Sequence, residues 1–304
     1  MIHEMLTMVL SILFGMVGRS LGIFRDEDGA LLSRIVLLIF LPSMIILSMR
    51  EIHREDLREM AVILLAGMAV LLLTLAISAI FSKFSFKRRK DAIPVFMLNS
   101  TFGNGGFMGV PIVFAIYGYE GVQRILFANL GFAFVFWTLG VYICALSSSE
   151  RFSTKYALKE LITNPPTVST FLGLFLALLS IPIPEVLADL MRILGEATVP
   201  LSMIAIGIFI RLSSFRSYLF PSLLNGFFKF LISPLTAVLI SEIMNLSELN
   251  SRILFLFALM PPAVLNTILA SRYSLDTELS SAITVINTFM SIPLIFLILL
   301  FWSS

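Results

Sequence analysis

The sequence predicts an all-α integral membrane protein whose ten transmembrane helices form two inverted five-helix repeats, each with one broken helix. Hydrophobic residues make up 58% of the 304, and charged residues only 13%, about half of the share typical of soluble domains. Apolar stretches of about 20 residues recur along the chain, the length that crosses a bilayer core of about 30 Å. One such stretch in each half is interrupted by glycine, asparagine or proline.

Ten apolar stretches have the length of a span. The first could be mistaken for a secretion signal, but no basic segment precedes it, and it contains Gly15, Gly18 and Arg19 without a small-residue cleavage motif. We therefore interpret it as a membrane span. The predicted spans are residues 4–24, 31–49, 60–81, 92–117, 122–146, 162–181, 190–210, 217–241, 252–271 and 278–302.

Composition argues against several other classes of protein. The net charge of +2 is too small to indicate a nucleic-acid partner. The single cysteine, Cys144, has no partner for an internal disulfide and is best explained as a buried apolar thiol. His3 and His53 have no second histidine at ligand spacing, so we expect no metal site and no cofactor.

The distribution of basic residues predicts the orientation. Fourteen Lys and Arg residues lie in the odd-numbered loops and their flanks, and six lie in the even-numbered loops. The excess of basic residues marks the cytoplasmic side. We therefore expect a multi-pass protein of the inner, cytoplasmic membrane with both termini extracytoplasmic. The weak point is the second loop, EIHREDLRE, which mixes acids with arginines.

The two halves can be superposed as sequences. Residues 1–146 form the first predicted repeat, 147–164 a cytoplasmic linker and 165–304 the second repeat. An offset of 158 places Gly15 on Gly173, Arg34 on Arg192 and Pro42 on Pro200, and near the breaks the best offset is about 156. Apolar spans resemble one another, so chance supplies some of these matches. Because each half has five spans, the second copy enters the membrane upside down, the arrangement of many secondary transporters.

The two broken spans carry the candidate site. Glycines allow the backbone to leave the helical path, and prolines lack an N–H and free carbonyls one turn earlier. The candidate break residues are Gly103, Gly105, Gly106, Gly109 and Pro111 in the fourth span and Pro261 and Pro262 in the ninth. The candidate substrate-binding residues are Asn99, Thr101 and Asn104, then Asn266 and Thr267.

A crossing of these spans would favour an anion. The N-terminal ends of the second half-helices would point to the middle of the membrane with partial positive charge. The alternative is that the glycines serve helix packing and the prolines only kink their helix. Matched breaks in both halves favour a binding site. Asn129, Thr284 and Thr288 are further candidates for lining the cavity, although such a residue, taken singly, more often makes an interhelical hydrogen bond.

Two ionisable residues inside the spans are candidates for ion coupling or charge support. Lys229 lies well inside the eighth span, where an ionised group is by default a functional hypothesis; the alternative is a snorkelling or structurally paired lysine. Glu196 follows Arg192 by one helical turn. A local ion pair between them is the simpler interpretation than proton coupling.

The strings GNGGFMGVPIVFAIYG, ATVPLSMIAIGIFI and ALMPPAVLNTILASRYSLD, with Lys229 before Pro234, together resemble the auxin efflux carrier family. That family includes bacterial membrane transport proteins often labelled malate or malonate permeases and, more distantly, the plant PIN-type carriers. The resemblance covers nearly the whole chain. It implies a scaffold and a transport domain, a fourth and ninth span that cross as in bile-acid symporters and sodium–proton antiporters, and a homodimer.

By the same resemblance, the crossover prolines would be Pro111 and Pro261 or Pro262, with Asn104 beside the substrate and Asn266 as its nearest counterpart. The expected function is secondary or potential-driven transport of a small organic anion, a carboxylate, by elevator-type alternating access. A sodium- or proton-coupled exchanger of the same fold is the alternative, but neither broken span contains a carboxylate. A membrane-embedded enzyme is disfavoured, because no catalytic set of side chains converges on the breaks.

Overall fold

The computed structural model of the chain describes residues 2–86, 91–148, 153–209 and 218–303. These ranges are helical, with no strand and one isolated antiparallel bridge. Shorter apolar helices cover Leu6–Ser20, Ala92–Thr101 and Pro165–Leu178. Six segments are long and apolar enough to cross a membrane: Glu27–Arg50, Arg54–Ser85, Gly105–Leu146, Glu185–Phe209, Leu219–Ile243 and Thr277–Trp302. The protein is therefore an all-helical, multi-pass membrane protein, while the count of ten spans and their inverted duplication stay predictions.

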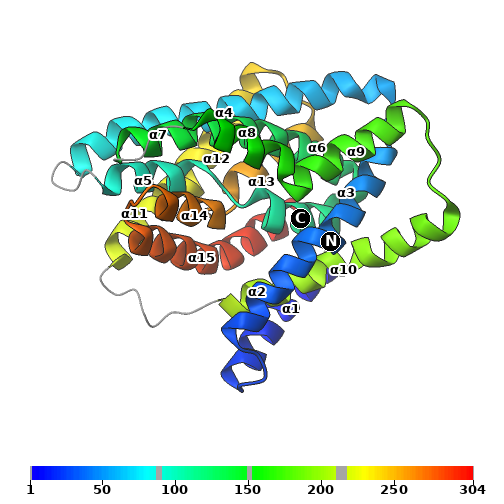
Figure 1. Cartoon of the computed structure of the whole chain (residues 1–304), viewed down its shortest axis with the longest axis horizontal. Helices are drawn as coiled ribbons and strands as arrows, with labels where there is room; N and C mark the ends of the chain where they lie inside the picture. Colours follow the sequence, from blue (N-terminus) through cyan, green and yellow to red (C-terminus); the bar gives the residue numbers. More distant parts are fainter. Residues whose placement is uncertain (1, 87–90, 149–152, 210–217, 304) are drawn as a thin grey trace.

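The helices follow one another with few long connections (Figure 1). In the first half they are α1 (Ile2–Ser20), α2 (Asp26–Ile35), η1 (Val36–Phe40), α3 (Leu41–Arg50), η2 (Arg54–Asp56), α4 (Leu57–Ser85), α5 (Ala92–Thr101), η3 (Gly105–Gly109), α6 (Val110–Val135), η4 (Phe136–Gly140) and α7 (Val141–Leu146). Then come α8 (Thr154–Thr163), α9 (Pro165–Leu178), α10 (Glu185–Phe209), α11 (Leu219–Phe227), η6 (Phe228–Ile232), α12 (Ser233–Ile243), α13 (Glu248–Leu259), α14 (Val264–Arg272) and α15 (Thr277–Ser303).

Some helix boundaries differ from the sequence-based expectation. The predicted linker contains a helix, α8, which ends just before α9 begins at Pro165. Asn164 separates the two helices and caps α9 by accepting a hydrogen bond from Thr167 N. The fourth and fifth predicted spans are joined without a loop, because only Gly118 departs from helical geometry between them, with φ 59°. A positive φ of this kind favours glycine.

The helices divide into two groups by their contacts. The peripheral bundle consists of α1, η1, α2, α3, α9 and α10, in which α1 packs along α10 and α3 along α9. A side chain at Gly15 would collide with the backbone of Ile204 on α10, and one at Gly173 would come within about 3.0 Å of Ile46 on α3. These two close helix approaches therefore require glycine.

The second group, the crossover bundle, consists of α4 to α7 and α11 to α15 with η3, η4 and η6. Here α4 packs against α5, α6 and α12, α13 packs against α12 and α6, and α15 packs against α11 and α14. Figure 1 shows α5, α11, α14 and α15 together on one side of the molecule and α1, α2 and α10 together on another. A hydroxyl pair, Thr74 with Thr236 at 3.0 Å, joins α4 to α12.

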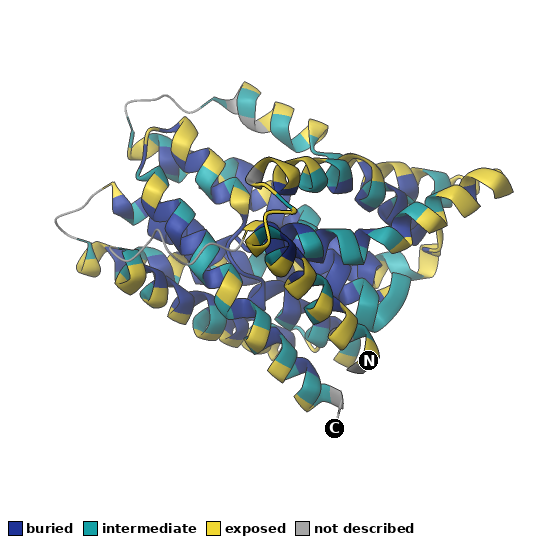
Figure 2. Cartoon of the chain, turned by 90° about the horizontal axis from the view of Figure 1, so that it is seen from below, coloured by how far each residue is buried: buried dark blue, intermediate teal, exposed yellow. Residues whose placement is uncertain are grey.

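Burial follows the expectation for a protein in lipid. Buried residues fill the centre of the bundle, and exposed residues face outward along the helices (Figure 2). Many of these outward residues are large and apolar, among them Val186, Phe220 and Phe301, which are 85%, 76% and 80% exposed. Such extensive apolar exposure is exceptional for a soluble protein and is expected for helices that contact acyl chains.

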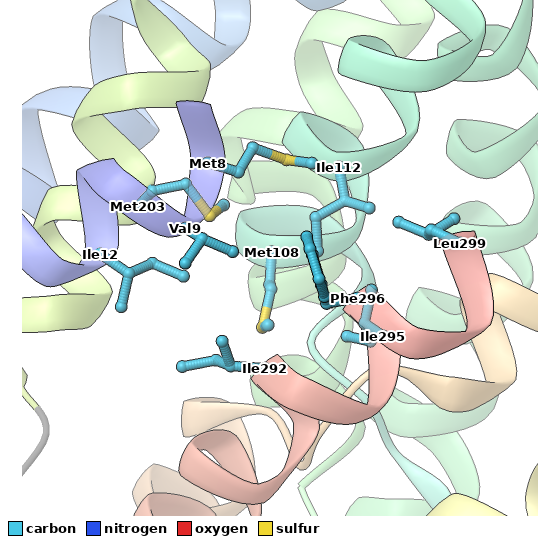
Figure 3. A pocket seen from close by; sticks show the side chains of 10 residues that line it. All are labelled: Met8, Val9, Ile12, Met108, Ile112, Met203, Ile292, Ile295, Phe296 and Leu299. Carbon is cyan, nitrogen blue, oxygen red and sulfur yellow. The ribbon is translucent and has the colours of Figure 1, made fainter. Parts of the chain in front are cut away.

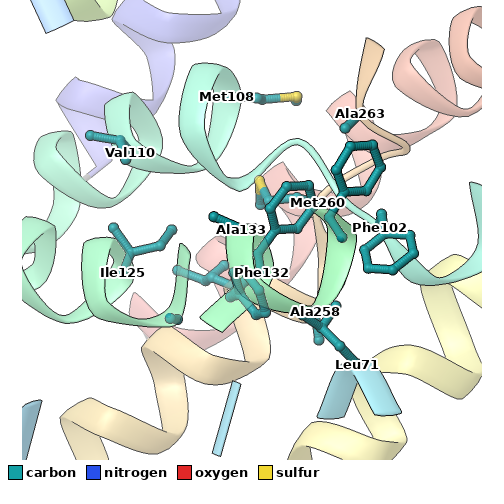
Figure 4. Close-up of a cluster of buried hydrophobic side chains, with 14 of the residues drawn as sticks. Leu71, Phe102, Met108, Val110, Ile125, Phe132, Ala133, Ala258, Met260 and Ala263 are labelled. Carbon is teal, nitrogen blue, oxygen red and sulfur yellow. The ribbon is translucent and has the colours of Figure 1, made fainter. Parts of the chain in front are cut away.

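A cluster of buried apolar side chains surrounds the two broken spans (Figure 4). Phe102 packs edge-to-face against both Phe132 and Phe136, with ring centroids 5.6 and 5.0 Å away, an arrangement that aromatic pairs prefer. Met260 and Ala263 from the other broken span lie beside the same rings. The phenylalanines near the breaks therefore form a packed support.

Candidate functional site

The two interrupted spans meet at their breaks. Helix α5 ends at Thr101 and α13 at Leu259, and the short extended segments that follow pair in antiparallel fashion, with Gly103 opposite Pro262. Asn104 N donates to Pro261 O at 2.7 Å, and Ala263 N donates to Phe102 O at 3.0 Å. Each span thus satisfies backbone groups that the break in the other has freed, which lipid could not do.

Gly103 and Pro262 suit this crossing for different reasons. A Cβ on Gly103 would lie 2.8 Å from Met260 O and 2.9 Å from Lys229 Nζ, so no larger residue fits without displacing one of them. Pro262 has no N–H. None is needed at this position, because the two backbone hydrogen bonds lie on either side of the Gly103–Pro262 pair. The facing residues Gly103 and Pro262 are 159 positions apart in the chain.

The second half-helices begin directly after the two paired segments of the crossing, one at each end of the pairing. Segment η3 starts at Gly105 and α14 at Val264. The first N–H groups of a helix have no acceptor within it and give that end partial positive charge. Asn104 is the N-cap of η3, and its Oδ1 accepts a hydrogen bond from Phe107 N at 3.2 Å. Two positive helix ends therefore converge where the spans cross.

A large cavity of about 850 Å³ opens in front of these helix ends. One wall comes from the crossover bundle and includes Gly103, Asn104 and Gly106; the other comes from α2, α9 and α10 of the peripheral bundle. Its polar lining is Ser33, Arg34, Asn104, Asn129, Asn164, Thr167, Thr170, Thr267, Ser281, Thr284 and Thr288. Among the described residues that line it, Arg34 is the one charged side chain and none is a carboxylate.

The glycines of the fourth span differ in what surrounds them. A Cβ on Gly106 would meet nothing within 4 Å, so Gly106 presents bare backbone to the cavity. At Gly105 a Cβ would lie 2.5 Å from Asn129 Oδ1, and at Gly109 it would lie 2.9 Å from Ile125 Cδ1. Gly106 is thus open to a solute, whereas Gly105 and Gly109 permit close packing.

Only part of the predicted binding set lines the cavity. Asn104 and Thr267 do. Asn99, Thr101 and Asn266 are completely buried behind the crossing and are absent from the cavity wall. Asn266 Nδ2 donates to Phe102 O at 2.9 Å, so its amide supports the break in the opposite span. The residue 159 positions after Asn104 is Ala263, which has no amide side chain; its N–H donates to Phe102 O.

The buried amides form a hydrogen-bonded network behind the site. Asn99 Nδ2 donates to Val95 O at 2.9 Å and Ser280 Oγ at 3.0 Å, and Thr284 Oγ1 donates to Asn99 Oδ1 at 3.2 Å. Because Thr284 also reaches the cavity, the network links the cavity wall to the buried end of α5. These amides therefore hold the break in shape.

Lys229 reaches the crossing from η6. The residue is 1% exposed, and its Nζ donates to Thr101 O at 3.2 Å, at the C-terminal end of α5. Such an end carries partial negative charge, which an ammonium stabilises. The structure thus places Lys229 in contact with a broken span, behind the pair Gly103–Pro262 and outside the cavity lining.

Two expectations from the sequence are wrong in detail. Glu196 is exposed on α10 and is not at the crossing. Arg192 forms an ion pair at 2.7 Å with Asp189, one turn before it, and not with Glu196. Asp189 and Glu196 both lie on the same helix face as Arg192, so helix geometry alone permits either pair. Pro111 does not mark the break, since the chain is already helical from Gly105 and Pro111 falls within the first turns of the new helix.

Sequence reasoning missed the wall contributed by α2. In the sequence, Arg34 was counted among the basic residues of the odd-numbered loops and matched to Arg192, but it was not predicted to line a cavity. The residues of this wall are Ala30, Ser33, Arg34, Leu37 and Leu38, spaced as i, i+3, i+4, i+7 and i+8, which is one face of a helix. That spacing, with an arginine inside it, was the available signal.

A second, small hollow lies between the two bundles (Figure 3). It holds about 30 Å³, and its lining is entirely apolar. Met8 and Ile12 of α1 and Met203 of α10 form one side, and Met108 of η3 with residues of α15 forms the other. Here the bundles are nearly closed against each other.

Comparison with known proteins identifies the family. Residues 1–299 match the signature of a family described as membrane transport protein. The chain belongs to this family. The resemblance to auxin efflux carriers noted in the sequence is thereby confirmed, and the protein is a membrane transporter of that family.

Relatives from archaea and bacteria cover almost the whole chain. The uncharacterized transporter MJ1031 of Methanocaldococcus jannaschii is 28% identical over 93% of both chains. An uncharacterized transporter of Methanothermobacter thermautotrophicus is 28% identical over 95% of this chain and 94% of its own. The uncharacterized transporter YfdV of Escherichia coli K12 is 22% identical over 96% of both. All three are described as transporters, and their printed descriptions name no substrate.

Proposed function

We propose that this family member is a secondary carrier that moves a small organic anion, a carboxylate, across the cytoplasmic membrane. One observation carries the proposal. Two positive helix ends and the Asn104 amide face a cavity of about 850 Å³ whose described lining has one arginine and no carboxylate. Helix ends stabilise anions, and amide donors bind a carboxylate without selecting one particular acid. This arrangement therefore favours anionic cargo over a metal cation.

The proposal includes ten spans in two inverted repeats, residues 1–146 and 165–304. Two sets of contacts support the duplication. The contact of Gly15 with Ile204 corresponds, at an offset of 158 from each partner, to the contact of Gly173 with Ile46. The crossing supports it independently. At an offset of 159, Asn104 corresponds to Ala263 and Phe102 to Pro261, so the bond from Asn104 N to Pro261 O corresponds to the bond from Ala263 N to Phe102 O. Repeats of five spans imply opposite orientations.

The proposed mechanism is elevator-type alternating access. In it the crossover bundle carries the site and slides against the peripheral bundle. Its support is that the large cavity lies between the bundles, while the apolar hollow of Figure 3 is nearly closed on another part of the same interface. The cavity includes Asn164, at the end of the linker. With the linker on the cytoplasmic side, as the basic residues predict, this is an inward-facing state with both termini outside.

A sodium- or proton-coupled exchanger receives no support from the site. Exchange of these ions needs a carboxylate at the crossing, and neither broken span contains one. The ionisable side chain at the crossing is instead Lys229, which donates to Thr101 O. Its amino group already occupies the carbonyl end of α5, so this acceptor is satisfied within the protein.

The test is transport by the purified protein in liposomes. We expect uptake of a labelled carboxylate, found by screening mono- and dicarboxylates with indole acids included, and little response to an imposed sodium gradient. Asn104→Ala should reduce uptake by about tenfold, the effect of losing one hydrogen bond to a charged group. Absence of carboxylate uptake by a folded, correctly inserted protein would contradict the proposal.

A second variant separates binding from capping, because Asn104 also caps η3. Asn104→Ser keeps an oxygen that can accept from Phe107 N but loses the amide donors. If the amide binds the cargo, Asn104→Ser should retain the thermal stability of the parent and still lose uptake. Normal uptake by Asn104→Ser would remove the amide from the site.

A further inference from the structure

The wall that faces the crossing carries an arginine whose charge no described side chain neutralises. Arg34 is exposed to the cavity from α2, and it has no ion pair or hydrogen bond within the described part of the chain. Beside it, the Ser33 hydroxyl is buried without a hydrogen-bond partner. The nearest neighbours of Arg34 on this helix face are Ala30, Leu37 and Leu38. The wall therefore offers one guanidinium in mostly apolar surroundings.

The composition of the cavity makes this charge effective. A cleft with apolar walls and charge of one sign focuses the field and raises the local concentration of the opposite ion. In this cavity the positive helix ends lie on the crossover bundle and Arg34 lies on the peripheral bundle. An anion that enters between the bundles meets positive potential on both sides.

We propose that Arg34 captures the carboxylate at this face of the membrane and that Arg192 does the same at the opposite face. The inference rests on the proposed function and extends it to specific residues of the wall. A guanidinium binds a carboxylate through two parallel hydrogen bonds, a geometry that lysine does not reproduce. Arg34 thus orients the anion before the helix ends at Gly105 and Val264 receive it.

The repeat relationship assigns the second arginine. Arg192 lies 158 positions after Arg34, the offset that also relates the Gly15 and Gly173 contacts. Arg192 and Ile206 both lie on α10, and Ile206 lines the present cavity. The fourteen residues from one to the other span about 21 Å at the rise of an α-helix. Arg192 is therefore far from the present cavity, toward the other face.

In the present state Arg192 is paired with a residue of its own helix and not with a carboxylate substrate. Its Nη1 contacts Asp189 Oδ1 at 2.7 Å, and the two side chains are 56% and 54% exposed. An ion pair so exposed to solvent is weak, so a carboxylate can replace Asp189 once the cavity opens on that side. Arg34 has no such local partner in the present state, in which its own cavity is already open.

Sided kinetics test the proposal. In liposomes with the carrier in one orientation, we expect Arg34→Gln to raise the KM for entry from the linker side about tenfold and to leave the other side near normal. Arg192→Gln should do the reverse. Arg34→Lys should recover only part of the loss, because it restores charge without the paired hydrogen bonds. Arg50→Gln, the same change at the exposed end of α3, should change neither KM.

Thiol labelling gives a readout independent of transport. The single native cysteine, Cys144, is buried, so an Arg34→Cys variant offers one accessible thiol. A membrane-impermeant maleimide should label it from the linker side only, and the transported carboxylate should slow the labelling. Labelling that the carboxylate does not affect would overturn the assignment of Arg34.

Each outcome separates this inference from the proposed function. If a bulky residue at Gly106 abolishes carboxylate uptake while Arg34→Gln leaves both KM values unchanged, the carrier function stands and the capture role fails. If Arg34→Gln raises KM equally at both faces, the assignment of one arginine to each face fails. If the parent protein moves no carboxylate, the proposed function itself fails.

Discussion

Gly106 is the residue at which the cavity and the backbone meet without a side chain between them. Since a Cβ there would touch nothing within 4 Å, Gly106→Leu should fold normally and fill space that the cargo needs. We expect carboxylate uptake to fall at least tenfold with little change in melting temperature. The measurement is liposome uptake together with thermal unfolding in detergent. Wild-type uptake by Gly106→Leu would show that the cargo does not pass this surface.

The neighbouring glycine is the matched control. A Cβ on Gly105 would lie 2.5 Å from Asn129 Oδ1, so Gly105→Ala must displace the Asn129 amide from the start of η3. We expect Gly105→Ala to lower the melting temperature, unlike Gly106→Leu. Gly106→Leu would then lower transport at nearly unchanged stability, whereas Gly105→Ala would lower the melting temperature.

At the scale of single elements, three prolines follow irregular turns. Pro42, Pro111 and Pro234 each come two residues after a π-helical segment, namely η1, η3 and η6. Proline lacks an N–H and clashes with the carbonyl one turn earlier, and a widened turn moves that carbonyl away. Such turns recur at functional sites, and here η6 carries Lys229 and η3 begins at the crossing.

Arg124 joins three elements of the crossover bundle at one end. Its Nε donates to Asn250 Oδ1 at 2.9 Å on α13, and its Nη1 donates to Glu120 O at 3.0 Å. Nη2 lies 3.3 Å from Glu59 on α4 and 3.1 Å from Glu120, whose side chains are 54% and 65% exposed. The arginine itself is 10% exposed, so its loss leaves inward-facing acceptors unpaired.

We therefore expect Arg124→Ala to cost about 2 kcal/mol of stability, the scale for orphaning a buried acceptor. Glu59→Gln removes one exposed ion pair and should cost less than about 1 kcal/mol. Thermal unfolding of the two variants in the same detergent compares them. Equal losses would mean that the exposed ion pair, not the bonds to Asn250 and to the Glu120 carbonyl, stabilises this end of the bundle.

At the scale of the whole molecule, the apolar hollow of Figure 3 tests whether the bundles slide. Met108 on the crossover bundle and Met203 on the peripheral bundle line it from opposite sides. In the variant with Met108→Cys and Met203→Cys, bridging the thiols with Hg²⁺ should abolish uptake, and excess free thiol should restore it. Uptake that persists with the bridge formed would contradict movement at this interface.

The control pair lies within one bundle. Met8 on α1 and Met203 on α10 line the same hollow and belong to the peripheral bundle. Bridging Met8→Cys with Met203→Cys joins helices that keep their relative positions in the proposed cycle. Uptake should therefore continue, and inhibition by this bridge would mean that the peripheral bundle also rearranges.

Much of the architecture could be predicted from sequence because lipid imposes long apolar helices, and their interruptions stand out. The breaks near Gly103 and Pro261 were readable for that reason. Their register was not, since glycine and proline both end helices and do not state which residue faces which; the pairing of Gly103 with Pro262 depends on packing. The same dependence on packing decides that Asn266 points into the protein while the next residue, Thr267, lines the cavity. It also decides that Arg34 lines the cavity, which was not predicted from the sequence.

The placement of Lys229 has a consequence for how voltage acts on the cycle. Lys229 contacts Thr101, so in the proposed cycle it would travel with the crossover bundle. With Lys229 protonated, a bundle loaded with a monoanion displaces almost no net charge, whereas the empty bundle returns carrying one positive charge. A membrane potential of 100 mV changes the energy of one elementary charge that crosses the whole membrane by about 2.3 kcal/mol. The membrane potential would then act mainly on the return of the empty bundle. A capacitive current measured without carboxylate would detect that movement of charge.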